Sequence, residues 1–191
     1  MFRATLFRAT LAGIVGVLAA IALVGAPTAA SALPREDAAR TIYYNSGRAA
    51  ELAPLVDQAA EIWNSGVTTV RLVKGSGGIT VVTSENGSAP GTASCVGCTR
   101  GTINFYRNQI KQSGAGPLRV VVHEFGHILG LNHPPDIGNC DKVMAGGRCD
   151  NAQPNAQELA AVERFWAGRP APVAGPVDER GVFGAPALAG T

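Results

Sequence analysis

The sequence has almost no net charge and few aromatic side chains. Its 191 residues carry 16 Lys+Arg against 14 Asp+Glu, and aromatic residues make up only 6% of the chain. Arg3 and Arg8 lie in the first 32 residues, which hold no acidic side chain, so the chain from Leu33 onward is balanced. A neutral chain without a basic stripe among aromatics lacks the electrostatic footprint of a nucleic-acid partner, and we exclude that class. The hydrophobic content of 46% fits one globular domain and excludes a disordered chain.

The sequence has only one long hydrophobic run. It extends over 16 residues from Leu11 to Ala26, follows Arg3 and Arg8, and leads to the small residues 30–32. A membrane span needs about 20 apolar residues, whereas a basic start, a short apolar run and a small-x-small end are typical of a secretory signal. We predict a cleaved signal peptide over residues 1–32, and a secreted, extracellular protein with no membrane partner after cleavage. An uncleaved membrane anchor is the alternative.

Cysteines are few, but their number is even. Disulfides are favoured over free thiols in an exported chain, and Cys95, Cys98, Cys140 and Cys149 allow three pairings. Proximity in the sequence favours Cys95–Cys98 and Cys140–Cys149. A redox dithiol or half of a zinc knuckle is the alternative for Cys95 and Cys98, although this pair does not open a predicted helix.

The apolar pattern after the signal alternates between the periods of strands and helices. Runs rich in β-branched residues predict strands at 41–45, 68–73, 79–84 and 102–106. Helical spacing predicts helices at 48–64, 117–129 and 155–166. From Arg169 onward the chain is rich in Pro, Gly and Ala and lacks periodicity. We therefore predict a short segment 33–40, one α/β domain over residues 41–168 and a flexible tail over 169–191. The segment 33–40 is too short for a folded inhibitory pro-domain, so we expect no latency from a long prosegment.

The three histidines of the chain lie close together in the sequence. His123, Glu124 and His127 form H-E-x-x-H on the predicted helix 117–129. Residues four apart lie on one face of a helix, so one zinc ion can contact both imidazoles. Two core or surface histidines at helical spacing, without a metal, are the simpler alternative.

The residues after this helix offer a third ligand. Gly130 can adopt the left-handed conformation that ends a helix, and Pro134 favours an extended chain at His133. His123, His127 and His133 would leave a fourth zinc position open, as in catalytic sites. Asp136 is the alternative third ligand, or else a hydrogen-bond acceptor for a ligand imidazole.

The pattern H-E-x-x-H-x-x-G-x-x-H at residues 123–133 resembles the zinc signature of the metzincin metallopeptidases, and VMAGG at 143–147 is similar to their Met-turn. The segments AAEIWNSGVTTVRL (59–72), HEFGHILGL (123–131) and PNAQE (154–158) resemble the snapalysin family of small secreted neutral proteases. The resemblance implies a single metzincin-like domain with a twisted mixed sheet of about five strands, an active-site helix and a C-terminal helix. It also implies a zinc site, a disulfide near Cys140 and Cys149, and cleavage of peptide bonds. We expect Met144 to pack beneath the metal without binding it.

Two positions depart from the snapalysin pattern. Snapalysin-like chains usually have Asp where His133 stands, and the Tyr expected shortly after the third ligand is absent. The side-chain specificity is therefore open. A phenolic partner for the reacting carbonyl would have to be Tyr43, Tyr44 or Tyr106.

Together these features predict a secreted, monomeric zinc endopeptidase that acts on protein or peptide substrates, with Glu124 as its general base. An exported binding protein that uses zinc only to stabilise its fold is the alternative. A calcium ion would be consistent with a secreted metallopeptidase, but the sequence has no D-x-D-x-D-G loop to supply its ligands.

Overall fold

The computed structural model describes residues 38–168 and 171–184 of the chain. The predicted signal peptide, residues 1–32, lies outside these residues, and so do residues 33–37 of the segment that follows it. None of the helices in the described part of the chain has the length and apolar character needed to cross a membrane.

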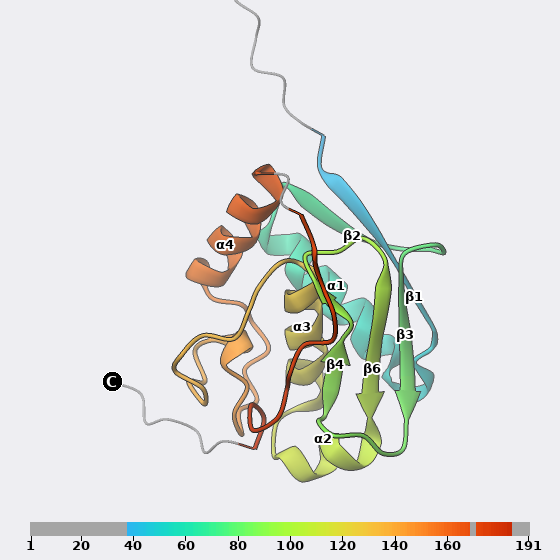
Figure 1. Ribbon diagram of the computed structural model, residues 1–191, viewed down its shortest axis with the longest axis vertical. Coiled ribbons are helices and arrows are strands. Elements are labelled where there is room, and N and C mark those ends of the chain that lie inside the picture. The colour runs from blue at the N-terminus through green and yellow to red at the C-terminus, as the bar shows by residue number, and fades with distance from the viewer. Residues whose placement is uncertain (1–37, 169–170, 185–191) are drawn as a thin grey trace, which may run out of the picture. The chain divides into compact units, whose positions relative to one another are not determined.

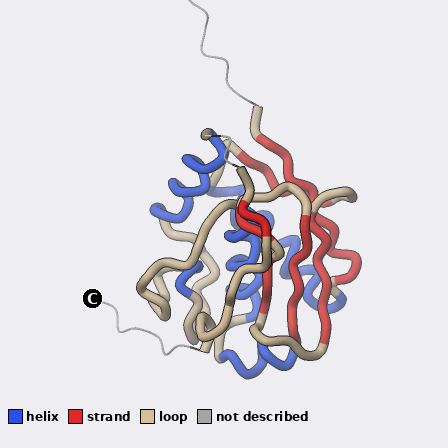
Figure 2. The backbone as a smooth tube through the Cα atoms, in the orientation of Figure 1, coloured by secondary structure: helices blue, strands red, loops and turns tan. Residues whose placement is uncertain are grey.

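The core of the fold is a five-stranded mixed sheet (Figures 1 and 2). Its strands, in spatial order, are β2 (Val70–Lys74), β1 (Arg40–Arg48), β3 (Ile79–Ser84), β6 (Gly101–Tyr106) and β4 (Gly91–Ala93). The first four strands are parallel, and β4 runs antiparallel to β6 at the edge. In β1, buried and exposed side chains alternate, so Ile42 and Tyr44 point into the core. The predicted mixed sheet of about five strands is confirmed.

Helices α1 (Ala53–Gly66) and α3 (Pro117–Ile128) pack against each other beside the sheet (Figure 1). A short 3-10 turn, η1 (Ala50–Leu52), leads into α1. Trp63 of α1 is fully buried and donates its indole N–H to the carbonyl of Val122 in α3 at 2.9 Å. Every residue of α3 from Arg119 to Ile128 is buried, so this helix forms part of the core.

The C-terminal helix α4 (Ala156–Ala167) begins at the predicted cap. The side chain of Asn155 accepts hydrogen bonds from the amides of Gln157 and Glu158, and the Glu158 carboxylate accepts one from the Asn155 amide. This reciprocal pair is a capping box, which supplies partners for amides that a helix start leaves free. At the other end of α4, Trp166 donates to the carbonyl of Leu129 at 3.0 Å, which holds α4 against the end of α3.

Several short elements have no counterpart in the prediction. They are β4, β5 (Cys95–Val96), β7 (Val173–Ala174), the helix α2 (Arg107–Ser113) and the 3-10 turn η2 (Val143–Ala145). The strands have only two or three residues each, too few for a period of two to be visible, and pairing with distant residues defines them.

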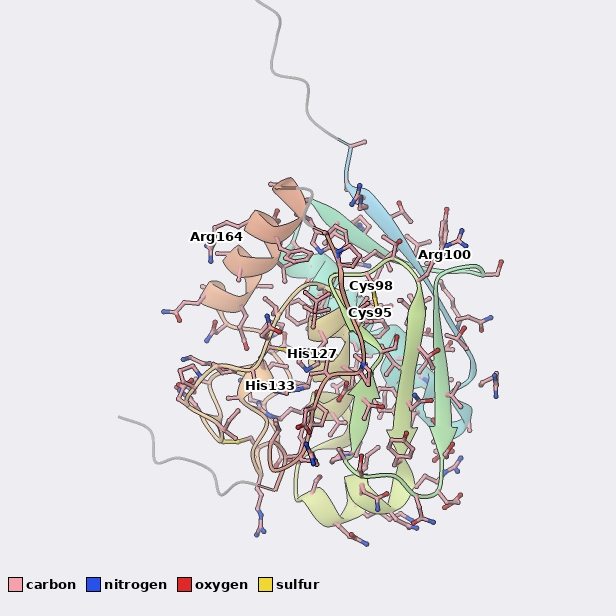
Figure 3. All side chains as sticks on the ribbon, in the orientation of Figure 1. Cys95, Cys98, Arg100, His127, His133 and Arg164 are labelled. Carbon is pink, nitrogen blue, oxygen red and sulfur yellow. A yellow bond between two sulfur atoms is a disulfide. The ribbon has the colours of Figure 1, made fainter. Side chains whose placement is uncertain are left out.

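The structure joins Cys95 to Cys98 and Cys140 to Cys149. Their Cα atoms are 6.1 Å and 5.4 Å apart, within the usual range for disulfides. This is the pairing that sequence proximity favours. Cys95 begins β5 and Cys98 lies in the turn that leads to β6, and Figure 3 shows both residues beside the red segment of the chain that includes β7.

Residues 171–184, which we call the C-terminal strap, differ from the predicted flexible tail. The strap packs against the domain: β7 pairs antiparallel with β5, and Glu179, Val182 and Phe183 are buried. These side chains are anchored by residues far away in the sequence. The local periodicity of the sequence therefore does not indicate that these side chains are buried.

Candidate metal centre

Helix α3 presents His123 and His127 on one buried face, as the spacing predicts. The helix ends in a Schellman motif. The Gly130 amide donates to the carbonyl of His127, and the Leu131 amide donates to that of Gly126, both at 2.9 Å. Gly130 has φ of 101°, a left-handed conformation that glycine adopts without steric cost. The chain then turns back and carries His133 to the two helix histidines.

The three imidazoles share one point in space. The Nε2 atoms of His123 and His127 are 3.1 Å apart, and the Nε2 atom of His133 lies 3.2 Å from the first and 3.1 Å from the second. Figure 3 shows His127 and His133 next to each other. The structure therefore brings together the three side chains that the sequence analysis proposed as zinc ligands.

Backbone carbonyls fix which nitrogen of each helix histidine faces this point. Nδ1 of His123 lies 2.9 Å from the carbonyl of Val143, and Nδ1 of His127 lies 2.7 Å from that of Leu131. A carbonyl only accepts, so Nδ1 carries the proton and Nε2 presents a lone pair. Burial lowers the pKa of His123 to about 4, which keeps its imidazole neutral at physiological pH.

A fourth group, which the sequence analysis missed, completes the cluster. Glu179 of the strap places Oε1 2.8 Å from Nε2 of His127, and Oε2 lies 3.1 Å from His133 and 3.3 Å from His123. No motif surrounds Glu179 in the sequence, so spacing gave no indication of its position.

The crowding of these four groups fits a bound cation. At the helix histidines, Nε2 lone pairs face carboxylate oxygens with no proton to share, and Oε1 of Glu179 has no hydrogen-bond partner despite its short approach to His127. A tetrahedral zinc ion with ligands at about 2.0 Å separates its ligand atoms by about 3.3 Å, close to the spacings observed here. Three nitrogens and one carboxylate oxygen are also ligands that zinc accepts. The donor set therefore fits zinc.

Glu124 lies next to the cluster but makes no hydrogen bond. Both of its carboxylate oxygens are buried and unpartnered. The carboxylate packs against the edge strand, where a Cβ on Gly91 would come within 2.5 Å of Oε1. Burial, and after it the charge of Glu179, raise the pKa of Glu124 well above its usual value. The carboxyl of Glu124 therefore binds a proton more tightly than the carboxyl of an exposed glutamate.

The predicted methionine turn lies beneath α3. Met144 is in η2 and is buried, and its Sδ atom occupies the space that a side chain at position 126 would need. Gly126 within H-E-x-G-H thus permits the close approach of helix and turn.

Two buried charged residues hold this turn in place. Glu158 of α4 accepts hydrogen bonds from the amides of Val143 and Met144 at 3.2 and 2.8 Å, in addition to capping its own helix. Arg119 of α3, which is fully buried, donates to four backbone carbonyls of the surrounding loop, those of Cys140, Lys142, Gly146 and Asn151. The turn is therefore held from both neighbouring helices.

The other candidates from the sequence lie elsewhere. Asp136 accepts hydrogen bonds from Lys142 and Asn139 at 2.8 and 2.9 Å, and it is neither part of the cluster nor an acceptor for Nδ1 of His123 or His127. Tyr44 donates to Asp57 at 3.1 Å, Tyr43 is 47% exposed, and the ring of Tyr106 packs against Gly87. Within residues 38–168 and 171–184, no second group of His, Cys, Asp and Glu side chains is close enough to share an ion, so we assign no calcium ligands.

The mixed sheet, the buried helix with H-E-x-x-H and the methionine turn beneath it are features of the metzincin class. Comparison with known families is more specific. Residues 39–169 match the model of the Streptomyces extracellular neutral proteinase (M7) family. The chain belongs to this family. The strap lies beyond the matched residues, so Glu179 is outside the part that the family model describes.

Curated relatives agree with this assignment. An extracellular small neutral protease of Streptomyces sp. (strain C5) is 38% identical over 146 residues, which cover 72% of this chain and 61% of the relative. The protein of the same name from Streptomyces caespitosus is 36% identical over 135 residues, covering 66% of this chain and 97% of the relative. The chain thus matches about three fifths of the length of the first of these relatives. Archaemetzincin from Methanopyrus kandleri has a similar structure, with 16% identity, coverage of 70% of this chain and 98% of that chain, and a TM-score of 0.44; we infer nothing from this weak likeness.

Proposed function

We propose that this protein is a secreted, monomeric zinc endopeptidase that hydrolyses peptide bonds of extracellular proteins, with His123, His127 and His133 as zinc ligands. The observation that carries the proposal is the convergence of the three Nε2 atoms to within 3.1–3.2 Å of one another, beside an unpaired carboxyl on the same helix. The names of the relatives, extracellular small neutral proteases, support the same reaction class and compartment.

The residues around the site have distinct roles in this proposal. Bound zinc supplies Lewis acidity, which polarises a carbonyl and lowers the pKa of water toward about 7. Glu124 accepts the proton of the attacking water and passes it to the nitrogen of the leaving amine. The carbonyls of Val143 and Leu131 keep the helix imidazoles in the tautomer that binds metal. Met144 and Gly126 form an apolar floor that keeps solvent from the back of the histidines.

The test compares zinc-loaded parent protein with Glu124→Ala on casein and on a peptide library. Because Glu179 lies among the imidazoles, both proteins are also prepared with Glu179→Ala. We expect Glu124→Ala to keep its zinc and to lose on the order of 100-fold or more of the hydrolysis rate, the usual contribution of a general base. A chelator should abolish the activity of the active forms.

Because His123, His127, His133 and Glu179 could together fill all four positions of a zinc ion, one alternative to the peptidase is an exported binding protein that zinc stabilises. Structural zinc sites have four protein ligands and no open position. That alternative predicts zinc without turnover in every variant. Equal hydrolysis by the proteins with and without Glu124 would contradict the proposed mechanism.

A further inference from the structure

The C-terminal strap, dark red in Figure 1, brings Glu179 to the histidines of the metal centre. At its beginning, β7 pairs with β5, and the amide of Val177 donates to the carbonyl of Ala93 at the edge of the sheet at 2.9 Å. At its end, the carbonyl of Val182 accepts from the amide of Gly147, just after the methionine turn, also at 2.9 Å. Between these two attachments lies Glu179. The strap thus bridges the two structures that flank the histidines.

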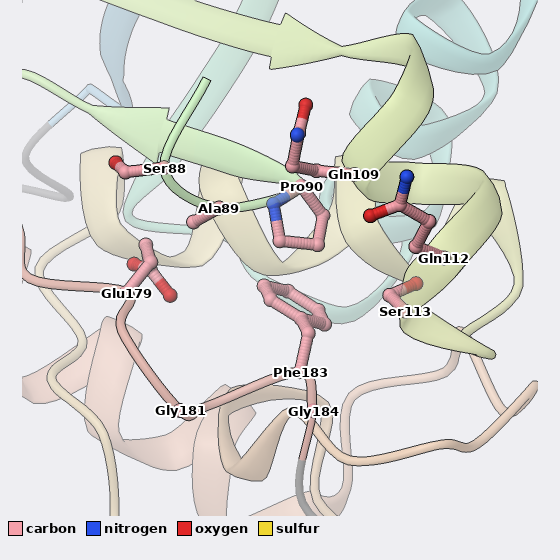
Figure 4. Close-up of a pocket in the computed structure, with 10 residues that line it drawn as sticks. All are labelled: Ser88, Ala89, Pro90, Gln109, Gln112, Ser113, Glu179, Gly181, Phe183 and Gly184. Atoms are coloured by element: carbon pink, nitrogen blue, oxygen red, sulfur yellow. The ribbon is translucent and has the colours of Figure 1, made fainter. Parts of the chain in front are cut away.

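The strap is attached by few side chains. Within residues 171–184 the buried residues are Glu179, Val182 and Phe183, whereas the chain from 171 to 176 is exposed throughout. The ring of Phe183 packs against that of His123 with centroids 4.7 Å apart. Figure 4 shows Glu179 and Phe183 lining one side of a pocket of about 220 Å³, with Pro90 and residues of α2 on the other. The strap is therefore attached by the pairing of β7 with β5, by two backbone hydrogen bonds, and by Val182 and Phe183, which belong to the hydrophobic core.

Two consequences of this attachment concern the chemistry of the site. The carboxylate of Glu179 lies against the Nε2 atoms of all three imidazoles, from where it could supply a fourth ligand to a bound metal. The backbone of the strap also uses the Ala93 carbonyl, at the free edge of the sheet to which an extended peptide could add as a strand. The buried carboxylate of Glu124, which lies against Gly91 of β4, has no hydrogen-bond partner.

We propose that the strap is a built-in inhibitor, in which Glu179 is a fourth and removable ligand that closes the metal against water and substrate. The inference rests on the proposed function. Opening requires only that the strap leave, since the three histidines, Glu124 and the methionine turn all lie outside it.

The test replaces zinc with Co²⁺ in the full chain and follows the visible absorption of the metal while azide is added. Azide binds a metal only where a coordination position is open. We expect azide to leave the spectrum of the parent unchanged and to shift the spectrum of Glu179→Ala. The apparent affinity for azide should be at least about tenfold higher in the variant, because the state with an open coordination position is no longer a minor one. Glu179→Gln, which keeps the size of the side chain, should lie between them.

Asp178→Ala is the matched control. Asp178 is the neighbour of Glu179 in the strap, is exposed, and pairs only with Arg180 at 2.7 Å. Its removal should leave azide binding as in the parent. The Co²⁺ content of each protein, measured by elemental analysis, verifies that the variants are folded and loaded.

Two results would overturn the inference. Equal azide binding by the parent and Glu179→Ala would mean that the fourth position is already open. Loss of Co²⁺ from Glu179→Ala would mean that Glu179 is a permanent structural ligand. Hydrolysis separates this inference from the proposed function: if Glu179→Ala binds azide tightly but cleaves no peptide when loaded with zinc, the strap closes the site as inferred and the peptidase assignment fails.

Discussion

Two regions of the chain meet at the same point and reach it in different ways. The segment 123–133 supplies three nitrogens through a helix, a glycine turn and a short return. The C-terminal strap supplies one carboxylate from a residue 46 positions after His133, attached by long-range contacts alone. The first region builds a site that its own sequence encodes, whereas the second occupies a site that other residues have built. We therefore expect the two regions to respond differently to substitution.

The largest contrast concerns the metal itself. His123→Ala removes one of three nitrogens from a rigid, buried helix, and we expect the purified protein to contain essentially no zinc at micromolar total concentrations. Glu179→Ala removes a ligand that the histidines do not depend on, so the zinc content should stay near one ion per chain. Elemental analysis after dialysis against a weak chelator measures both.

Asp136→Ala is the control for this comparison. Asp136 is the acidic residue that the sequence alone left as an alternative third ligand, and in the structure it pairs with Lys142. Its loss should leave the zinc content unchanged. Zinc loss from Asp136→Ala with retention in His133→Ala would reverse the assignment of the third ligand.

The same contrast explains how much of the site the sequence could predict. The histidine spacing, the glycine that ends α3 and the two disulfides are local features, and each is visible within a dozen residues. The main strands and helices were also predicted, because their periods extend over five residues or more. Arg119, Glu158 and Glu179 were not identified as functional. Apart from Asn155, which Glu158 caps, their partners are backbone groups or side chains 14 to 56 positions away, and no local pattern distinguishes them from solvent-exposed charges.

A further prediction concerns Arg119, which stabilises the loop beneath helix α3. It is fully buried and donates to four carbonyls of the loop that carries Met144. Arg119→Ala removes a donor from all four carbonyls and opens a cavity at a fully buried position, so we expect the free energy of unfolding to fall by about 3 kcal/mol or more. Urea denaturation measures this loss. Arg164→Ala, at an exposed position on α4, is the matched control and should change stability by no more than about 0.5 kcal/mol.

The smallest effect compares the same substitution in the strap and in the core. Val162 of α4 and Val182 of the strap are both buried, at 0% and 5% exposure. Val162→Ala removes two carbons from the shared core and should lower the free energy of unfolding by about 2 kcal/mol.

If the strap opens on its own before the domain unfolds, Val182→Ala lowers only the free energy of that local opening. Global stability should then change by less than about 0.5 kcal/mol, while hydrogen exchange at the Val177 and Gly147 amides rises on the order of tenfold. Equal losses of global stability from the two substitutions would mean that the strap and the domain unfold as one unit. In that case the strap could not leave the metal centre without destroying the site, and the difference between the two regions would not extend to their stability.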